Sequence, residues 1–464
     1  MSRLLLGLMA FVMLMAPASP ASAQIAIDWE ATFGDLNADI AYDVQPTGDG
    51  GFIAAGFGTQ GNFEHIMVVK TDAQGQAQWQ RTLNFNNYSE RAYDVIPAND
   101  GGALVIGRLY LPGVADFRPW LIKLDADGNT EWSSEAGLSL QANVDSAVVR
   151  GLQRADGSLL LAGSSRTPNN SREPWLATAS PTGTLQSLVV YPALPGTTNQ
   201  GATIAGLAAT PDGGFVLLGS TIYPWSPAPI LWKFDADGQS QWVRNYGSPA
   251  SPALRAANAV RPANDGGYLL AGCEAPNCTD TVLLKTDALG NPLWSRRYEQ
   301  PLNNQGRDLI ERPDGGYLLA QTSVDAAGSN AYSAELLELD ADGELIDVTS
   351  LPGGAQATFV TRLTALDDGF VAAGYVDDGA GIGNLDFYLA RGTWDEPAGA
   401  PGACPDFDGS QWVDVGDVAM AAAHWQTHSA APDWNPIFDR NGDGVVDMAD
   451  ILLVSMHWGA YCGP

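Results

Sequence analysis

Histidine and basic residues are scarce in this sequence. Only 4 of its 464 residues are His, and one of them, His65, falls within the repeated part of the chain described below. A Ser-His-Asp triad or a metal site built from several histidines is therefore not expected in that part. Lys and Arg number 23 against 53 Asp and Glu, which gives a formal net charge of -30 at pH 7. Such a charge disfavours nucleic acids and anionic membranes as partners, because both are negatively charged.

Long apolar runs are also missing after the first part of the chain. Arg3 and the apolar stretch Leu4–Met15 are followed by Ala21-Ser22-Ala23, which is the pattern of a secretory signal peptide over residues 1–23. The apolar stretch is too short to span a membrane. We therefore expect an exported protein without a membrane span, at the cell surface or outside the cell, with the periplasm as the alternative.

The chain has only 4 cysteines, and export would permit them to form disulfides. Cys273 and Cys278 are close in sequence, whereas Cys404 and Cys462 bracket the C-terminal region. Four cysteines can pair in three ways. We expect Cys273–Cys278 and Cys404–Cys462, because this pairing closes the shortest loops and keeps each bridge within one domain.

Glycine, in contrast, is abundant, and much of it recurs in one phrase. The phrase is Asp-Gly-Gly, or a close variant, followed by an apolar stretch that in most copies ends in Ala-Gly or Leu-Gly. Seven copies occur, at Gly48–Gly56, Asn99–Gly107, Ala155–Gly163, Pro211–Gly219, Asn264–Gly272, Pro313–Gln321 and Asp367–Gly374. A period of about 50 residues with strand-like content indicates a solenoid or a propeller. The weak helical periodicity favours a seven-bladed β-propeller over residues 24–395.

Each repeat predicts a blade of four strands. In the first repeat the predicted strands cover residues 41–46, 52–55, 65–70 and 78–83. The seventh repeat ends after its third strand, at residues 386–391, and residues 28–34 match the outer-strand pattern of residues 241–247. We therefore expect the N-terminal strand to complete the seventh blade, which leaves the ring without an open edge strand.

A tryptophan follows the second turn of several repeats in the pattern Lys-x-Asp-Ala-x-Gly-x-x-x-Trp, as at Lys70, Asp72, Gly75 and Trp79. The pattern resembles the tryptophan-docking motif of pyrroloquinoline-quinone-type propellers. Those quinone enzymes have eight blades and a vicinal Cys-Cys disulfide against the cofactor, whereas the close cysteine pair here is not adjacent. We therefore expect the tryptophans to pack between blades and not to bind a cofactor. They are Trp79, Trp132, Trp242 and Trp294.

The loops on the face opposite the tight turns are one candidate ligand surface. They are longer and carry aromatic residues, which suit sugar stacking or contact with a protein. The alternative is that these residues only cap the edges of the blades. They are Tyr110, Phe117, Trp120, Trp175, Tyr223 and Trp225.

The inner strands offer a second candidate. Asp43, Asp94 and Asp308 lie near the starts of these strands, with Arg91 and Arg307 close to two of them in sequence. The carboxylates either line the central channel as an acid/base pair, or they hold the strands together through hydrogen bonds and pairs with arginine. No catalytic residue is assigned from the sequence.

A linker rich in Pro, Gly and Ala, residues 396–403, leads to a C-terminal module, residues 404–464. The segment Asp439–Asp450 has the pattern of a calcium loop, with Gly444 at the sixth position and oxygen donors at the spacing that wraps one ion. The predicted calcium ligands are Asp439, Asn441, Asp443, Val445 (through its backbone carbonyl), Asp447 and Asp450.

A related segment precedes this loop. Gln411 replaces the glycine of the sixth position and a serine replaces the carboxylate of the fifth, so we expect weaker calcium binding here. Each segment runs into a predicted helix, over residues 417–426 and 450–458. The predicted ligands of the first segment are Asp406, Asp408, Ser410, Trp412 (through its backbone carbonyl), Asp414 and Asp417.

Two such loop-helix units, with Asp at the twelfth loop position and no helix before the loop, resemble a type I dockerin domain. The resemblance implies two calcium ions and a cohesin-like or other surface protein as the partner of residues 404–464. It also implies a docking surface that includes Val415-Gly416 and Met448-Ala449, which differ from the Ser/Thr type usual at these places. We expect His424 and its counterpart His457 to pack against the helices and not to bind a metal ion.

These features predict an all-β seven-bladed propeller joined to a small helical, dockerin-like module with two calcium loops. We expect a secreted, non-catalytic binding or scaffolding protein that is anchored by calcium-dependent docking to a surface or an extracellular assembly. A glycan or a protein would bind the loop face of the propeller. The alternative is a carbohydrate-active enzyme, a polysaccharide hydrolase or lyase, tethered by the same module.

Overall fold

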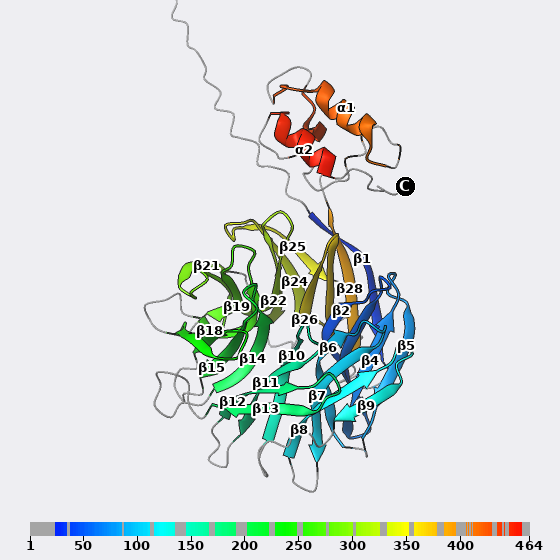
Figure 1. Cartoon of the computed structure of the whole chain (residues 1–464), viewed down its shortest axis with the longest axis vertical. Coiled ribbons are helices and arrows are strands. Elements are labelled where there is room, and N and C mark those ends of the chain that lie inside the picture. The colour runs from blue at the N-terminus through cyan, green and yellow to red at the C-terminus, as the bar shows by residue number, and fades with distance from the viewer. Residues whose placement is uncertain are drawn as a thin grey trace, which may run out of the picture. The chain divides into compact units, whose positions relative to one another are not determined.

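A computed structural model of the chain contains two compact units, Ile25–Trp394 and a smaller one that includes Asp395–Pro464 (Figure 1). The predicted signal peptide and linker, and the cysteines 404 and 462, lie outside the described residues. In the described part no helix is long and apolar enough to cross a membrane. The structure describes residues 24–34, 38–85, 88–111, 116–134, 145–166, 172–191, 202–221, 228–247, 254–274, 278–299, 303–324, 332–351, 357–377, 385–395, 405, 407, 410, 412–428, 434–438, 440 and 445–456.

Seven sheets of four strands make up the larger unit. Six of them take four consecutive strands from the inner to the outer edge. These six are β2 (Asp39–Pro46), β3 (Phe52–Gln60), β4 (Phe63–Thr71) and β5 (Ala77–Leu83); β6 (Glu90–Pro97), β7 (Ala103–Leu111), β8 (Asp116–Leu124) and β9 (Thr130–Ser134); β10 (Asp145–Gln153), β11 (Leu159–Arg166), β12 (Arg172–Ala179) and β13 (Leu185–Val190); β14 (Ala202–Ala209), β15 (Phe215–Thr221), β16 (Pro229–Phe234) and β17 (Ser240–Asn245); β18 (Leu254–Pro262), β19 (Tyr268–Glu274), β20 (Thr281–Thr286) and β21 (Pro292–Tyr298); and β22 (Asn303–Glu311), β23 (Tyr317–Val324), β24 (Tyr332–Leu339) and β25 (Leu345–Leu351).

The seventh sheet joins the two ends of the propeller. It contains β26 (Ala357–Leu366), β27 (Gly369–Asp377) and β28 (Leu385–Asp395), with β1 (Gln24–Phe33) as its outer strand. The inner strands contact one another in a closed cycle in which β26 meets β2. The predicted seven-bladed propeller and its completion by the N-terminal strand are therefore confirmed.

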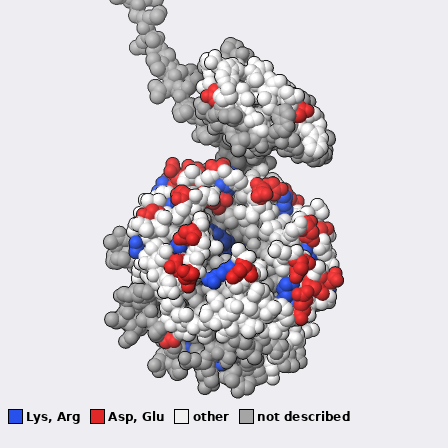
Figure 2. Space-filling view, viewed as in Figure 1, with Lys and Arg blue, Asp and Glu red and all other residues white. Residues whose placement is uncertain are grey.

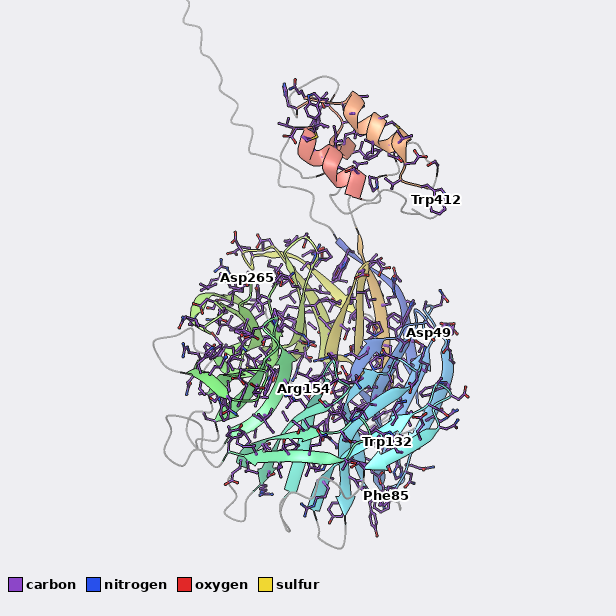
Figure 3. All side chains as sticks on the ribbon, viewed as in Figure 1. Asp49, Phe85, Trp132, Arg154, Asp265 and Trp412 are labelled. Atoms are coloured by element: carbon purple, nitrogen blue, oxygen red, sulfur yellow. A yellow bond between two sulfur atoms is a disulfide. The ribbon has the colours of Figure 1, made fainter. Side chains whose placement is uncertain are left out.

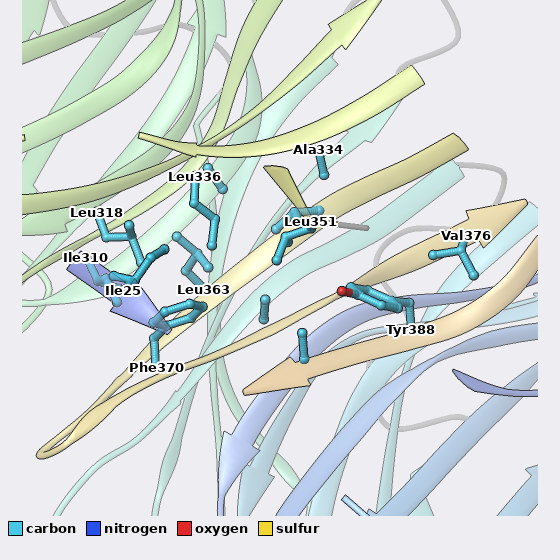
Figure 4. Close-up of a cluster of buried hydrophobic side chains, with 14 residues drawn as sticks. Ile25, Ile310, Leu318, Ala334, Leu336, Leu351, Leu363, Phe370, Val376 and Tyr388 are labelled. Carbon is cyan, nitrogen blue, oxygen red and sulfur yellow. The ribbon is translucent and has the colours of Figure 1, made fainter. Parts of the chain in front are cut away.

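The N-terminal strand is held by apolar packing and by polar contacts. Ile25 belongs to a buried cluster between the last two sheets that includes Leu318, Phe370 and Tyr388 (Figure 4). The backbone N–H of Ile25 donates to Glu338 Oε1 at 3.2 Å. Burial of this apolar cluster stabilises the closed ring, because each fully buried large apolar side chain contributes about 1.5–3 kcal/mol.

A β-bulge interrupts the pairing of every inner strand with its neighbour at the same place. In the first blade, Ala41 pairs with Gly56 and Asp43 with Ala55, so Tyr42 is the extra residue. The bulge presses a carbonyl of the inner strand onto the glycine that ends the repeated phrase. A Cβ atom at Gly56 would lie 1.8 Å from the Ile40 carbonyl oxygen. The bulge thus explains why the phrase ends in glycine.

The aspartate of the repeated phrase is fixed by a lysine from the third strand of its blade. The Lys70 ammonium is buried and donates to Asp49 Oδ2 at 2.8 Å. Lys233 binds Asp212 in the same way, and this hydrogen bond lowers the pKa of Asp212 to about 2. The Lys and Asp of the two repeated patterns therefore meet at one turn in these blades. Asp49 and Asp265 mark two of these turns in Figure 3.

The repeated tryptophans join neighbouring blades, as predicted. The Trp79 ring covers Gly128 in the second turn of the next blade, and its indole N–H donates to the Ala126 carbonyl at 3.0 Å. Trp29 of β1 covers Gly75 of the first blade in the same way, which extends the pattern across the closure. The third blade has Ser187 in place of this tryptophan. Gly238 of the fourth blade, which a tryptophan at position 187 would cover, therefore has open space around it.

The smaller unit contains α1 (Val415–Ala423), the 3-10 turn η1 (Pro436–Phe438) and α2 (Met448–Met456). Its core includes Val413, Ala421, Phe438, Val446 and Val454, all buried. Both helices begin two residues earlier than predicted. The reason in α1 is a capping box, in which the residue before the helix and the third helical residue bond to each other's backbone N–H groups.

We predict that Gly128→Ala destabilises the propeller more than Gly238→Ala. Both glycines have positive φ angles, +78° and +79°, so both substitutions cost about 1–2 kcal/mol for a left-handed alanine. Only at Gly128 would the new Cβ meet a tryptophan, at 2.9 Å, which adds about 1–3 kcal/mol of overpacking. Denaturant unfolding of both variants measures the difference. Equal losses would show that the tryptophan contact does not couple the blades.

Candidate functional site

The first loop segment of the smaller unit ends on a fully buried carboxylate. Asp417 Oδ1 accepts the backbone N–H of Phe407 at 2.5 Å, and Oδ2 accepts the backbone N–H of Asp414 at 2.8 Å. These partners stand at the second and the ninth loop positions. Asp417 therefore ties the beginning of the segment to the start of α1.

The second segment repeats this arrangement. Asp450 is also fully buried, and its Oδ1 and Oδ2 accept the N–H groups of Arg440 at 2.6 Å and Asp447 at 2.7 Å. The two segments therefore hold their twelfth-position carboxylates in the same way.

The structure describes part of each predicted ligand set. Ser410, Trp412, Asp414 and Asp417 of the first segment are described, as are Val445, Asp447 and Asp450 of the second. The predicted ligands Asp406, Asp408, Asp439, Asn441 and Asp443 lie outside the described residues. Among the described residues, no group of three or more His, Cys, Asp or Glu side chains is placed to hold a metal ion.

Two loop positions in the first segment bond to each other. The Ser410 hydroxyl donates to the Trp412 carbonyl oxygen at 2.8 Å. These are the fifth and seventh positions, both of which were predicted to bind calcium. A neutral hydroxyl contributes less charge to a calcium site than the carboxylate at the same position of the second segment, and weaker binding by the first segment stays a prediction.

Apolar side chains are exposed at matching places of the two segments. At the seventh position Trp412 is 51% and Val445 37% exposed, and at the tenth position Val415 is 68% and Met448 55% exposed. Figure 3 shows Trp412 projecting from the edge of the unit. His424 packs against Phe438 with ring centroids 4.1 Å apart, as predicted, whereas His457 lies outside the described residues.

The central channel of the propeller holds the inner-strand aspartates. Each of them accepts a backbone N–H of the next blade: Asp43 Oδ2 from Val95 at 3.0 Å, Asp94 Oδ2 from Gly151 at 2.8 Å and Asp308 Oδ2 from Leu363 at 2.9 Å. These bonds tie neighbouring inner strands together, which is the structural role that the sequence left open.

The arginine partners of these aspartates differ from those expected. Arg362 Nε lies 2.9 Å from Asp43 Oδ1, and Arg261 lies 2.5 Å from Asp308 Oδ2. Arg91 instead pairs with Glu64, and Arg307 stacks on an aromatic ring. The reason is the bulge, because it turns residues next to each other on an inner strand in different directions. One signal for Arg362 is present in the sequence: it stands at the post-bulge position, which Asp43 has in the first blade.

Asp43 and Asp94 form a buried pair with opposite pKa shifts. Burial raises the pKa of Asp94 well above its usual range, and the neighbouring Asp43 carboxylate raises it further. Burial also acts to raise the pKa of Asp43, but Arg362 and the hydrogen bond from Asp94 outweigh it, so that this pKa is lowered. The raised pKa favours the protonated form of Asp94, which donates a hydrogen bond to Asp43. Carboxyl groups in direct contact do not flank a glycosidic bond, which needs a separation of about 5 Å or more.

Aromatic residues gather near the bulges of several blades. Tyr42 and Tyr93 occupy the bulge positions of β2 and β6, with ring centroids 5.3 Å apart. Two of the predicted loop-face aromatics, Tyr110 and Phe117, also contact each other, at 5.2 Å. Trp120 and Trp175 were expected on the surface but are buried, because they lie inside strands β8 and β12. Tyr223 and Trp225 lie outside the described residues.

The predicted bridge between Cys273 and Cys278 is present, with Cα atoms 4.8 Å apart. It connects the end of β19 to the loop that follows. The second predicted pair, cysteines 404 and 462, lies outside the described residues. A disulfide is compatible with an exported protein.

Comparison with known proteins gives a likeness in architecture. No protein-family model matches the sequence, and no curated protein matches it. Among solved structures, the chain is similar to a protein of unknown function from Bacteroides caccae, with 13% identity over 64% of this chain and 93% of that chain and a TM-score of 0.39. A protein of unknown function from Dyadobacter fermentans has 11% identity over 80% and 99%, with a TM-score of 0.42. BBS1N in complex with ARL6DN has 10% identity over 81% and 98%, with a TM-score of 0.45.

We predict that Asp94→Asn and Asp43→Asn change stability in opposite directions at neutral pH. Asn replaces the protonated form of Asp94, so Asp94→Asn removes the cost of holding a carboxyl whose folded pKa is raised. This gain is absent below about pH 4, where both folded and unfolded forms are protonated, and it grows as the pH rises above that value.

Asp43→Asn removes the charge that pairs with Arg362, so it is expected to destabilise the protein by about 3 kcal/mol or more at neutral pH. This loss shrinks in acid. Thermal unfolding of both variants between pH 3 and pH 8 is the measurement. A larger loss in Asp94→Asn than in Asp43→Asn at pH 7 would contradict the assigned proton.

Proposed function

We propose that the protein is a secreted propeller scaffold whose smaller unit binds two calcium ions and docks to a partner protein on a surface or in an extracellular assembly. The observation that carries the proposal is the matched position of Asp417 and Asp450, each buried and each accepting N–H groups from the second and ninth positions of its segment. Two unrelated turns would not share this arrangement. The calcium-loop spacing of the sequence supplies the remaining donors.

Calcium is the ion that these donors suit. All predicted donors are oxygen atoms, from carboxylates, an amide, a hydroxyl and backbone carbonyls, and hard oxygen ligands favour calcium over zinc or copper. Asp417 and Asp450 would bind the ion through their carboxylate oxygens. The clustered carboxylates repel one another until a cation neutralises them, which couples calcium binding to folding of this unit.

The partner would be a protein with an apolar surface. Val415 and Met448 stand at the start of α1 and α2, and both are more than half exposed. The two segments therefore expose apolar side chains at equivalent positions. Grouped exposed apolar side chains mark interaction sites more often than single exposed apolar residues do. A cohesin-like surface protein is the partner class that the dockerin resemblance implies.

The propeller would bind a ligand at the surface around Tyr42 and Tyr93, where a glycan or a protein can stack on the aromatic rings. A polysaccharide hydrolase or lyase on the same scaffold is the second candidate, and the aromatic cluster is the observation that favours a glycan. The direct contact of Asp43 with Asp94 argues against these two carboxyls as its catalytic pair.

Calcium titration of the full chain tests the metal sites. After treatment with chelator, isothermal titration calorimetry is expected to show two ions, with the weaker one in the first segment. Asp450→Asn should weaken the tighter site by about tenfold or more, because it removes a charged ligand. Ser410→Asp should strengthen the weaker site. Binding of one ion or none by the unaltered chain would contradict the proposal.

Capture of a partner tests the docking role. The immobilised full chain is exposed to exported proteins of its own organism, in calcium and in chelator. A partner retained only in calcium, and lost when Val415→Lys and Met448→Lys are combined, is the expected result. The double variant must keep both calcium ions in the titration. If it retains the partner as well as the unaltered chain does, the apolar surface is not the docking site.

A further inference from the structure

One side of the propeller channel contains a cavity, and the sequence of the inner strands explains where it lies. The position after the bulge is charged in five of the seven inner strands, whereas β14 and β18 have Gly206 and Ala259 there. Because these two residues have no long side chain, a cavity of about 20 Å³ remains beside them. A cavity of this size holds a single water molecule or a particle of similar size.

The lining of this cavity is rich in positive charge. Arg150, Arg261, Arg307 and Arg362 line it together with a single carboxylate, that of Asp308. Figure 2 shows Lys or Arg atoms in a hollow near the middle of the propeller, with Asp and Glu around it. These arginines give the cavity lining a positive charge, although the chain as a whole has a formal net charge of -30.

Two of the four arginines have carboxylate partners. Arg261 pairs with Asp308 at 2.5 Å, and Arg362 pairs with Asp43 at 2.9 Å. Burial and the neighbouring Asp43 carboxylate raise the pKa of Asp94, which disfavours a negative charge on Asp94. The carboxylates of the channel therefore neutralise about two guanidinium groups.

The other two arginines hydrogen-bond to neutral groups, although the charge of Arg150 also acts on Asp43 and Asp94. Arg150 donates to the carbonyl oxygen of Tyr93. Arg307 donates to Thr322 Oγ1 at 3.3 Å, and its guanidinium lies 4.4 Å from the centre of the Phe359 ring. No ion pair of Arg150 or Arg307 is found within the described part of the chain. Both side chains are partly buried, and a partly buried cation that has no paired carboxylate would be stabilised by an anion from solution.

The pKa values of two lining arginines shift in opposite directions. Burial acts to lower the pKa of Arg362, but attraction by Asp43, Asp308 and Asp94 outweighs burial and raises it. Burial lowers the pKa of Arg261 to about 10, and repulsion by Arg362 and Arg150 acts in the same direction. The attraction of Asp308 does not restore the usual value. A negative ion near these guanidinium groups would counteract the repulsion.

We propose that this cavity is an anion site, in which Arg150 and Arg307 hold a small inorganic anion of the size of chloride or the carboxylate group of an organic acid. The volume admits about one water-sized group, so a carboxylate would place only an oxygen atom inside the cavity and the rest of the molecule would lie outside it. This site is in the propeller and does not depend on calcium docking by the smaller unit.

The experiment compares the thermal midpoint of the calcium-loaded full chain in sodium bromide, in sodium formate and in the sodium salt of a bulky sulfonate, all at equal ionic strength. Bromide represents an inorganic anion and formate a carboxylate. A rise of about 2–4 °C relative to the sulfonate is expected in bromide or formate. The salt with the larger rise identifies which of the two sources the site prefers. Crystals soaked in bromide should show anomalous scattering within hydrogen-bond distance of Arg150 and Arg307.

Three variants make the result specific. Arg307→Met should lose most of the rise, whereas Arg154→Met, which removes the same charge from a residue outside the cavity lining, should keep it. Gly206→Asp places a carboxylate at the empty post-bulge position, so it should abolish the rise without lowering the midpoint. Its Cβ would lie 3.3 Å from Leu218 Cβ, which a small shift accommodates. No rise in either salt, or an equal rise in Arg307→Met and Arg154→Met, would overturn the proposal.

Discussion

Pairing of β1 with β28 is the interaction on which the rest of the propeller depends. A ring of sheets has no free edge only if its first and last blades are joined. Here the joint is a shared sheet, and several side chains reinforce it. Tyr388 donates to Glu30, and Arg391 and Thr393 both bond to Asp28. Trp29 then carries the blade-to-blade tryptophan contact across the same joint. The closed ring fixes the radius of the channel and therefore the distances between the charged groups inside it.

The channel illustrates how bulges and charges work together. Each bulge adds one residue to the inner strand, so that adjacent side chains lie in different directions. Asp43, Asp94 and Asp308 accept backbone N–H groups of the next blade. Tyr42 and Tyr93, at the bulge positions, contact each other. The same irregularity therefore supplies both the bonds between blades and the candidate ligand surface.

The repeated phrase made the propeller predictable from the sequence, whereas the arginines of the proposed anion site do not follow the repeat. The phrase around Asp49 and Gly56 recurs because each blade needs the same turn and the same bulge. The missing outer strand of the seventh repeat pointed directly to Asp28 and Trp29. Arg150, Arg261 and Arg307 occupy different positions in their blades, so no pattern along the chain groups them. Only the closed ring brings them to one cavity.

Burial was harder to predict than topology. Trp120 and Trp175 follow variable loops in the sequence, yet each lies within a strand and contributes to the core between blades. The starts of α1 and α2 were placed two residues late, since an aspartate suits both the cap before a helix and its first turn. For the smaller unit the spacing of donors predicted two equivalent segments, and the paired hydrogen bonds of Asp417 and Asp450 show that the twelfth positions of the two segments are equivalent.

The closure of the ring also has a consequence for the order of folding events. Asp28 and Arg391 are separated by 363 residues in the sequence, so their contact is among the most non-local that a chain of this length can make. Contacts of high sequence separation form late, because the loop that they close must first lose its freedom. The first six blades can assemble from local hairpins as the chain emerges, while β1 waits unpaired for a partner strand near the other end. Until β28 is synthesised and pairs with it, β1 is an unpaired strand with which a strand of a second chain could pair.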